Sequence, residues 1–417
     1  MSGSHEGPVA RIAPAESMTD HAARAVVAAL RAEGAEVRFV GGCVRDALRG
    51  AAVSDVDLAT PDPPERVLAL LERAGIKGVP TGIEHGTVTA VADARPFEIT
   101  TLRLDVATDG RYAEVAFTDD WRADAARRDF TFNAMSLSPD GDLFDYFGGR
   151  ADLEAGRVRF VGDAARRIAE DYLRVLRFFR FLARFGHGEP DAAALAACAA
   201  AADKLGRLSI ERVRMELLKL LGAPAPVPAL QTMADLGVLP AVLPEAGALT
   251  DLLALCGIDD RDAVRRLAAL IGTQGEMVGR RLKMANAEIA RLARLAPPAR
   301  MLAADLDAAG QRQVLYDLGP DLFRDLVLLA WAGDRQGRAS HWRAMLETAN
   351  TWESPRLPVR GADITAMGVP GGPQVGRIVA GVEAWWRARD FQPGRQACLD
   401  VARALATGEE SVADADQ

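Results

Sequence analysis

The order of apolar and polar residues changes character near residue 151. Before that point, short runs alternate apolar and polar side chains, as strands buried on one face do, and helical stretches separate them. The predicted strands are 36–40, 55–59, 86–91, 97–101 and 142–146. The predicted helices are 17–33, 43–50 and 65–74. The first third of the chain is therefore predicted to be a mixed α/β domain.

Beyond residue 151, apolar residues recur at helical spacing, in long stretches of Ala, Leu and Arg that Pro and Gly interrupt. The predicted helices are 164–186, 191–204, 209–221, 228–236, 261–271, 286–295, 320–332 and 339–350. This part of the chain is predicted to form several small helical bundles. The acidic end, 408–417, is expected to be disordered.

Composition narrows the class of protein. A chain of 417 residues, 49% of them hydrophobic and 26% charged, is typical of a folded protein with several domains. The sequence has no apolar run long enough to span a membrane and no signal-peptide core near its start. Its four cysteines are far apart and form no CxxC pair, which predicts free thiols in a reducing cytoplasm.

Charge gives two opposing indications. The net charge of −8 argues against a nucleic-acid partner, because phosphate contacts need clustered Lys and Arg. Residues 150–184, however, hold nine Arg against five acidic residues. This local excess of positive charge allows nucleic-acid binding that weakens as the salt concentration rises.

Two carboxylates two residues apart are the first candidates for chemistry. Asp55 and Asp57 lie on a predicted strand, so both point to one face while Val56 and Leu58 face the core. Neighbouring carboxylates repel one another unless a cation lies between them, and Mg²⁺ prefers one or two carboxylates together with substrate phosphates. By itself, such a pair is more often a solvated edge or turn.

A glycine pair just before these acids adds a candidate phosphate-binding element. Gly41 and Gly42 end one predicted strand, and a helix follows near Cys43. A turn without Cβ atoms lets backbone N–H groups approach a triphosphate, the helix adds its positive end, and Arg45 can clamp phosphate oxygens. A lone Gly-Gly is usually a loop, but its combination with the following Asp-x-Asp strand indicates a nucleotide site.

Six short motifs follow one another between residues 38 and 215. They are GGCVRD at Gly41–Asp46, DVD at Asp55–Asp57, RRDFTFN at Arg127–Asn133, DYFGG at Asp145–Gly149, EDYLRVLRFFRF at Glu170–Phe181 and SIER at Ser209–Arg212. In this order they resemble the bacterial and eukaryotic-type class of tRNA nucleotidyltransferases and poly(A) polymerases, a branch of the polymerase-beta-like superfamily.

The resemblance implies an α+β fold, in which a polymerase-beta-like nucleotidyltransferase head of mixed sheet and helices precedes an all-helical neck, body and tail. The implied parts are a catalytic head at 1–150, a nucleotide-selecting neck at 151–220, a body at 221–300 and a tRNA-binding tail at 301–417. The implied activity is template-independent addition of CCA to the 3′ end of tRNA, by a two-metal transfer that releases pyrophosphate. The implied partners are tRNA, CTP and ATP, with two Mg²⁺ ions as cofactor and with neither membrane nor DNA.

The resemblance also assigns roles to residues. The catalytic and metal-binding residues are Asp55 and Asp57. The nucleotide-binding residues are Gly41, Gly42, Arg45, Arg128, Asp129, Asn133, Asp171, Arg174 and Arg177. Among these, Arg128, Asp129 and Asn133 are expected at the ribose, where an Asp can accept a hydrogen bond from the 2′-hydroxyl. Glu98, on another predicted strand, is a candidate third carboxylate, and the alternative is a position on the solvent face.

Asp171 and Arg174 are expected, by resemblance, to choose the nucleotide without a template. Three residues apart, they share one face of the predicted helix 164–186. Asp offers acceptors and Arg a fixed fork of donors, which together can match a base edge, and Arg177 continues the same stripe. Spacing alone would instead favour an ion pair between Asp171 and Arg174.

Two further segments carry expectations from the resemblance. Residues 103–120 are similar to the family's flexible loop near the catalytic centre. Glu211 and Arg212 are expected to hold the neck helices by an ion pair.

The end of the chain favours a tRNA enzyme within this family. Residues 361–376 look like the tail motif of CCA-adding enzymes, and the acidic composition differs from the basic extension typical of bacterial poly(A) polymerases. None of the five histidines precedes an Asp, so no metal-dependent phosphohydrolase activity is expected. The alternatives are a poly(A) polymerase, a partial enzyme that adds only CC or only A, and a catalytically inactive RNA-binding module.

Overall fold

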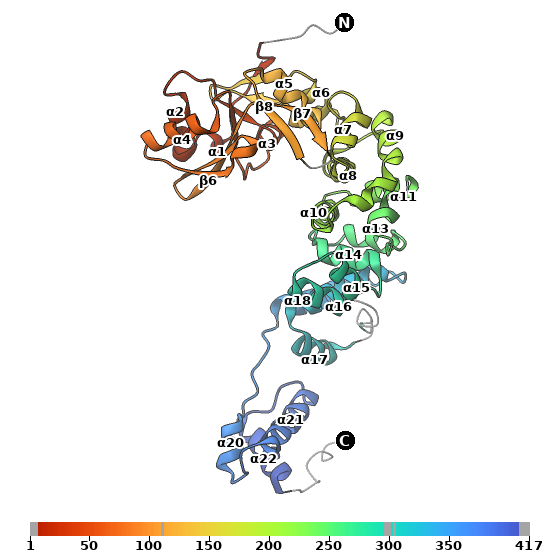
Figure 1. Ribbon diagram of the computed structural model, residues 1–417. Helices are drawn as coiled ribbons and strands as arrows, with labels where there is room; N and C mark the ends of the chain where they lie inside the picture. The colour runs from red at the N-terminus through yellow and green to blue at the C-terminus, as the bar shows by residue number, and fades with distance from the viewer. Residues whose placement is uncertain (1–6, 110–111, 296–301, 303–305, 408–417) are drawn as a thin grey trace. The chain divides into compact units, whose positions relative to one another are not determined.

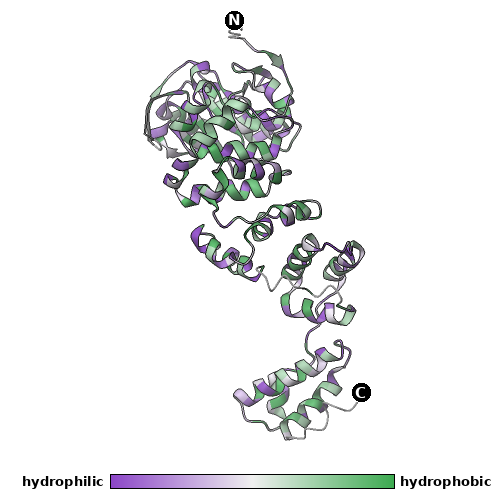
Figure 2. Cartoon of the chain, turned by 90° about the vertical axis from the view of Figure 1, so that its right-hand side faces the viewer, coloured by the Kyte–Doolittle hydropathy of each residue, from purple (hydrophilic) through white to green (hydrophobic). Residues whose placement is uncertain are grey.

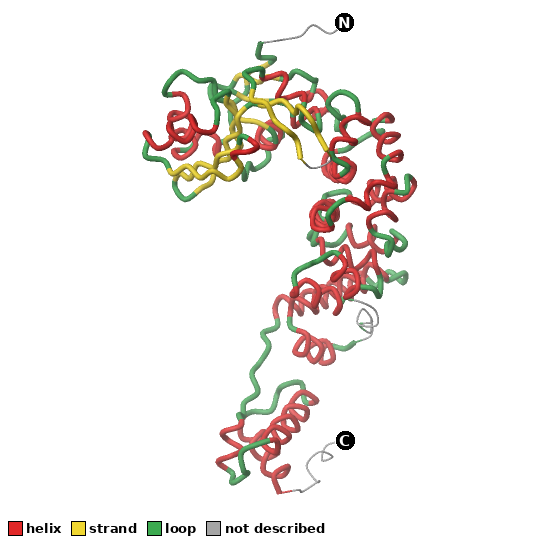
Figure 3. Tube along the Cα trace, in the orientation of Figure 1, coloured by secondary structure: helices red, strands yellow, loops and turns green. Residues whose placement is uncertain are grey.

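The structure, a computed structural model, describes residues 7–109, 112–295, 302 and 306–407. It divides into two compact units, Met1–Ala246 with Arg281–Lys283 and Gly247–Arg280 with Met284–Gln417. Strands occupy the N-terminal part of the described chain and helices the rest (Figure 3). The predicted division into head, neck, body and tail is finer than these units and stays a prediction. The predicted disorder of 408–417 falls outside the described residues.

A mixed eight-stranded sheet forms the centre of the first unit (Figure 1). Its order is β1-β10-β9-β2-β3-β6-β5-β4, and β3 and β6 are parallel neighbours. The strands are β1 Ala10–Arg11, β2 Arg38–Val40, β3 Asp57–Thr60, β4 Lys77–Gly82, β5 Thr87–Ala92, β6 Arg95–Thr101, β9 Ser136–Leu137 and β10 Asp142–Phe144. The predicted strands are confirmed, with bounds that differ by one or two residues, whereas β1, β4 and β9 were not predicted.

The segment predicted as a flexible loop is built differently. Two strands, β7 Arg103–Asp109 and β8 Tyr112–Phe117, pair antiparallel as a separate sheet. Most of the described part of this segment is therefore strand and not loop, because backbone hydrogen bonds between the two strands hold it, and its flexibility stays a prediction.

Helices α2 and α4 pack on one face of the main sheet, against β4, β5 and β6. The helices before residue 247 are α1 Glu16–Thr19, α2 His21–Arg31, α3 Gly42–Leu48, α4 Pro64–Arg73, α5 Trp121–Ala126, α6 Gly149–Glu154, α7 Ala164–Glu170, α8 Leu173–Phe185, α9 Ala192–Ala200, α10 Ile210–Leu221, α11 Pro226–Asp235 and α12 Val238–Val242. The predicted helix 17–33 is broken at Asp20, whose carboxylate accepts a hydrogen bond from Ala23 N and so caps α2. The predicted helix 164–186 is broken at Asp171.

A cluster of phenylalanines joins the end of the sheet region to α8. Phe130 stacks on Phe132 at 5.6 Å between ring centroids, and both meet the edge of Phe181 at 5.2 Å. Phe160 stacks on Phe178 at 5.9 Å on the other side. All five rings are almost fully buried. Aromatic burial of this extent holds the segments around Phe130 and Phe160 against α8, which matters for the site below.

Helices make up the described chain after residue 247. They are α13 Thr250–Cys256, α14 Ala263–Ile271, α15 Gly275–Arg281, α16 Asn286–Arg294, α17 Ala308–Leu318, α18 Pro320–Gly333, α19 Ala339–Thr351, α20 Gly361–Ala366, α21 Pro373–Ala388 and α22 Arg395–Thr407. Hydrophobic and hydrophilic residues alternate along single helices in this region (Figure 2). The apolar faces form one core around Trp342 and another around Trp386. None of the described helices is long and apolar enough to cross a membrane.

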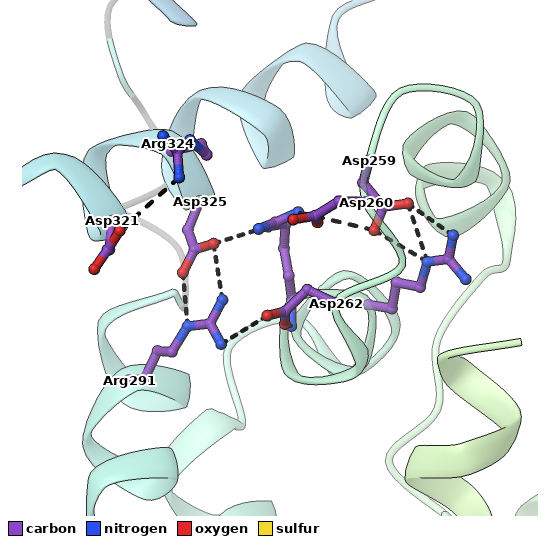
Figure 4. Close-up of polar contacts among 9 residues, drawn as sticks. Asp259, Asp260, Asp262, Arg291, Asp321, Arg324 and Asp325 are labelled. Carbon is purple, nitrogen blue, oxygen red and sulfur yellow. Dashed lines mark hydrogen bonds and ion pairs between the residues drawn. The ribbon is translucent and has the colours of Figure 1, made fainter. Parts of the chain in front are cut away.

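A buried ionic network links α14, α16 and α18 in the second unit (Figure 4). Asp325 accepts hydrogen bonds from Arg265 Nε at 2.8 Å and from Arg291 Nε at 2.7 Å. Arg266, next to Arg265, pairs with the buried Asp259 at 2.7 Å. Because Asp325 and Arg265 are both almost fully buried, the charge of each is stabilised mainly by the oppositely charged side chains around it.

Asp325→Ala should lower the free energy of unfolding of the second unit by about 3–5 kcal/mol, because it removes the buried carboxylate that accepts from both Arg265 and Arg291 and leaves Arg265 with the exposed Asp260 as its remaining close partner. Asp321→Ala is the matched control: it lies one turn earlier on α18, fully exposed, and should change stability by less than about 0.5 kcal/mol. Urea denaturation followed by tryptophan fluorescence measures both, since most of the tryptophans lie in this unit. Equal effects of the two substitutions would contradict the assignment.

Candidate active site

A glycine turn stands at the end of β2. Gly41 has φ 72° and ψ −127°, a conformation that only glycine adopts without strain, and α3 begins at the next residue. A Cβ atom at Gly41 would lie 3.2 Å from Arg128 Nη1, and one at Gly42 would lie 3.5 Å from Arg45 Nη2. Two guanidinium groups therefore approach the turn that the sequence predicted as a phosphate cradle.

Asp57 lies beside this turn and beside a second carboxylate. It begins β3, whose residues Leu58 and Ala59 pair with β2, and its register partner on the parallel strand β6 is Glu98. Val56 and Leu58 are buried, as predicted, while Glu98 is exposed on the opposite face. Burial raises the pKa of Asp57 to about 6, with the negative charge of Glu98 as the next cause and that of Asp55 as a smaller one.

These carboxylates fit a divalent cation. Within the described residues, no group of three or more His, Cys, Asp and Glu side chains is placed to enclose a metal by itself. Mg²⁺ needs only one or two carboxylates, because water and substrate phosphates complete its coordination. Burial, and after it the charge of Glu98, makes the ionised form of Asp57 unfavourable, and a bound cation would relieve both. Asp55 lies before the start of β3 and not on the strand as predicted, but its charge still acts on Asp57, so the two carboxylates suit the predicted metal.

Asp124 orients Arg128, and it was not among the predicted site residues. Its carboxylate on α5 accepts hydrogen bonds from Arg127 Nε at 2.8 Å and Arg128 Nη2 at 3.3 Å, and from the backbone N of Arg103 at 3.3 Å. Burial alone would raise the pKa of Asp124, but the charges of Arg128 and Arg127 outweigh it and lower the pKa. The spacing of three and four residues was the signal in the sequence that points to this contact.

A chain of hydrogen bonds runs from α3 to α8. Arg45 Nη1 donates to Asn133 Oδ1 at 2.7 Å, Asn133 Nδ2 donates to Asp129 Oδ1 at 3.0 Å, and Arg177 Nε donates to Asp129 Oδ2 at 2.7 Å. Burial opposes the negative charge of Asp129, but Arg177 and the hydrogen bonds hold its pKa below the usual value. Four predicted nucleotide-binding residues are thus in one buried network, which the sequence did not reveal.

Asp171 and Arg174 do not share a helix face, so that prediction is wrong. Asp171 lies between α7 and α8 in extended conformation, and its carboxylate accepts hydrogen bonds from Leu173 N at 3.1 Å and Arg212 Nη2 at 2.6 Å. Arg174 donates to Glu170 at 2.6 Å instead. The chain breaks at Asp171 because its side chain caps the start of α8.

Two expectations about charge in this region concern ion pairs. The expected ion pairs of Glu211 and Arg212 are present, but their partners were not predicted: Arg212 on α10 pairs with Asp171 at the α7–α8 junction, and Glu211 pairs with Lys283 at 2.7 Å. Eight of the nine Arg in 150–184 form ion pairs, so most of the local positive charge is neutralised. Glu216 on α10 is one of the acidic partners: its buried carboxylate lies 2.6 Å from Arg180 Nε. No local signal in the sequence indicated this contact.

Two models of known protein families match separate parts of this chain. Residues 37–159 match the family described as poly A polymerase head domain, and residues 189–249 match the family described as probable RNA and SrmB- binding site of polymerase A. CCA tRNA nucleotidyltransferase 1, mitochondrial, of Mus musculus is 36% identical over 86% of this chain and 85% of its own length. The chain belongs to the tRNA nucleotidyltransferase and poly(A) polymerase family.

Other relatives of the chain are named CCA-adding enzymes. The one from Limosilactobacillus fermentum is 31% identical over 86% of this chain and 90% of its own length. The crystal structure of the Bacillus stearothermophilus CCA-adding enzyme in complex with CTP superimposes with a TM-score of 0.67, at 26% identity, over 93% of this chain and 98% of that one. The predicted family and the α+β fold with a polymerase head are thereby confirmed.

Asp57→Asn should stabilise the metal-free protein. The pKa of Asp57 is about 6 in the fold against 3.8 ordinarily, so the wild type loses stability as the pH rises between these values. At about pH 8 in EDTA, the variant should unfold with a free energy about 1–2 kcal/mol higher, and the difference should vanish near pH 4. Urea denaturation at both pH values is the measurement, and equal stability at the higher pH would refute the raised pKa.

Gly41→Ala should weaken CTP binding by about tenfold or more, because the new methyl group displaces Arg128. Gly50→Ala is the control for backbone strain: its φ is also positive, at 62°, but nothing lies within 4 Å of the added Cβ. Both variants should lose about 1–2 kcal/mol of stability. Isothermal titration calorimetry with CTP separates them, and equal losses of affinity would remove the special role of Gly41.

Proposed function

We propose that this protein adds C, C and A to the 3′ end of tRNA from CTP and ATP, without a nucleic-acid template and with release of pyrophosphate. The observation that carries the proposal is the arrangement at the start of β3. There Asp57 lies between the Gly41 turn, which Arg128 approaches, and the carboxylate of Glu98. The relatives support the choice of substrate, because those that match most of the chain are named as CCA-adding enzymes.

The residues of the site divide into two groups by charge. Asp55, Asp57 and Glu98 form the negative group, and two Mg²⁺ ions bound at Asp55 and Asp57 would activate the attacking hydroxyl and neutralise the leaving pyrophosphate. Arg128, together with the backbone N–H groups that follow Gly41, forms the positive group and holds the triphosphate. The negative group would thus bind the metal ions, and the positive group would bind the phosphates of the nucleotide.

The ribose of the incoming nucleotide would bind at the network of Arg45, Asn133, Asp129 and Arg177. Asp129 already accepts hydrogen bonds from Phe130 N, Asn133 and Arg177, so a ribose 2′-hydroxyl would bind it in place of one of these donors. Burial opposes the charge of Arg177, but Asp129 and Glu216 raise its pKa and keep it cationic. A rigid network of this kind costs little reorganisation when the ribose binds.

Asp171 and Arg174 would read the base, although they lie on different local structures. Each is held by a neighbour, Asp171 by Arg212 at 2.6 Å and Arg174 by Glu170 at 2.6 Å. Arg174 also donates to the backbone oxygen of Arg127, at 3.3 Å, which ties the base-reading group to the head. Pre-positioned donors and acceptors can choose between CTP and ATP without a template strand.

The helical regions would hold the tRNA, as the predicted neck, body and tail. The glycine-rich stretch between α20 and α21 is one candidate, because Gly371 and Gly372 are exposed and have no side chain to keep a phosphate away from their backbone N–H groups. We also propose a cytoplasmic location from the four unpaired cysteines, although the mouse relative is named mitochondrial.

Turnover with tRNA that lacks its 3′ CCA tests the proposal. The wild type with Mg²⁺, labelled CTP and labelled ATP should add C, C and A and then stop. Asp57→Asn and Asp55→Asn should lower the rate by about a thousandfold or more, because neither can hold the metal, while tRNA affinity stays within about twofold. Asp93→Asn, an exposed carboxylate at the β5–β6 turn of the same sheet, is the matched control and should keep full activity.

Each other result points to a different function. Long A tails on any RNA would indicate a poly(A) polymerase, and arrest after CC or addition of A alone would indicate a partial enzyme. Binding of tRNA without incorporation by the wild type would indicate an inactive RNA-binding module. Retained activity in the Asp57 variant would contradict the assignment of Asp57 to the metal. It would not bear on the roles proposed for the residues that bind the phosphates, the ribose and the base.

A further inference from the structure

A row of polar side chains continues across the sheet from Asp57. Glu98 on β6 is the register partner of Asp57 on one side and of Thr89 on β5 on the other. The hydroxyl of Thr89 lies 2.8 Å from that of Thr81 on β4, in a hydrogen bond. Asp57, Glu98, Thr89 and Thr81, here called the polar row, therefore cross four neighbouring strands.

The polar row lies on the face of the sheet that points away from α2 and α4. Side chains alternate along a strand, and Val88 and Ala90 on either side of Thr89 are fully buried on the face that these helices cover. Glu98 and Thr81 are exposed. Thr81 is thus open to a ligand, and Thr89, which is half-buried, is partly so.

The position of the row relative to the glycine turn indicates which substrate would meet it. In nucleotidyl transfer, the attacking oxygen and the leaving pyrophosphate lie on opposite sides of the α-phosphate. The Gly41 turn and Arg128 lie on the β2 side of Asp57, where they would hold the pyrophosphate. The rest of the polar row lies on the β6 side. The attacking 3′ end of the RNA would therefore approach over Glu98 and Thr89.

The chemistry of the row suits a ribose better than a phosphate. Beyond Asp57 it holds one carboxylate and two hydroxyls, and no cation, so a phosphate group would be repelled by Glu98. In the Thr81–Thr89 pair one hydroxyl donates and the other accepts, so one hydroxyl hydrogen and several lone pairs remain for a ligand. A ribose 2′-hydroxyl, which both donates and accepts, matches this set.

We propose that the Thr81–Thr89 hydroxyl pair, with Glu98, binds the 2′-hydroxyl of the terminal ribose of the RNA acceptor strand. The proposal rests on the nucleotidyl transfer proposed above and names its acceptor subsite. It gives the enzyme a way to distinguish an RNA end from a DNA end, and it places the 3′-hydroxyl of the same ribose toward Asp57.

A comparison of two acceptors tests the proposal. The acceptors are tRNA lacking CCA and the same tRNA with a 2′-deoxy terminal nucleotide, and KM is measured for each with CTP in excess. The wild type should show a KM about three- to tenfold higher for the deoxy acceptor, the effect of one lost hydrogen bond. In Thr89→Val this ratio should fall to about one, while KM for CTP stays within about twofold.

Two further variants separate binding from folding. Thr89→Ser keeps the hydroxyl and should restore the wild-type ratio. Thr87→Val is the matched control on the same strand and the same face, two residues outside the row, where Thr87 pairs with Thr100, and it should keep the wild-type ratio. A wild-type ratio of one, a Thr89→Val ratio equal to that of the wild type, or equal loss in Thr87→Val would each overturn the proposal.

A binding measurement makes failure here distinguishable from failure of the proposed function. If the wild type incorporated nothing, the nucleotidyl transfer would be wrong, but the acceptor subsite would still be measurable. A short RNA hairpin with a single-stranded 3′ end, with and without the terminal 2′-hydroxyl, should then differ in Kd by about threefold or more for the wild type and not for Thr89→Val. Equal Kd values for the wild type would overturn the subsite independently of turnover.

Discussion

Repulsion between carboxylates at the start of β3 is the constraint on which the rest of the site depends. Backbone pairing with β2 and β6 sets Asp57 between the Gly41 turn and Glu98, whatever the side chains would prefer. The hydrogen bonds and buried residues of the sheet maintain this arrangement. Their combined stabilisation offsets the unfavourable electrostatic free energy of placing the carboxylates together. What results is a local negative charge that a cation relieves, next to a turn that accepts phosphate.

The arginines of the site are oriented by carboxylates of the protein itself. Asp124 orients Arg128, Asp129 orients Arg177, and Asp171 is in turn held by Arg212. Each pair is at least partly buried, which makes the ionic contacts stronger than surface pairs and keeps the side chains in one rotamer. The phenylalanine cluster packs the segment that carries Asp129 and Asn133 against α8, which carries Arg177. The fold therefore prepares the site before any ligand arrives.

Sequence pattern predicted the strands of the head well and the site contacts unevenly. The period-two runs at β5 and β6 carry a local signal, because these strands alternate buried and less buried residues, whereas β3 is buried at three consecutive positions. The helix around Asp171 was predicted as continuous, because a capping aspartate inside a helical period leaves the apolar spacing intact. The pairing of β7 with β8 was missed for a related reason: it joins two polar segments by backbone hydrogen bonds, which the apolar pattern does not record.

The amino-acid sequence by itself determined the chemical groups of the site and their local geometry: the glycine that accepts a positive φ, the two aspartates on alternate positions, and the fork of each arginine. Only the tertiary structure decided that Glu98 stands next to Asp57, that Thr89 stands next to Glu98, and that Arg212 holds Asp171. Contacts of this kind join residues that are distant along the chain. They depend on which strands and helices pair, and in which register, and no local pattern of apolar and polar residues contains that choice.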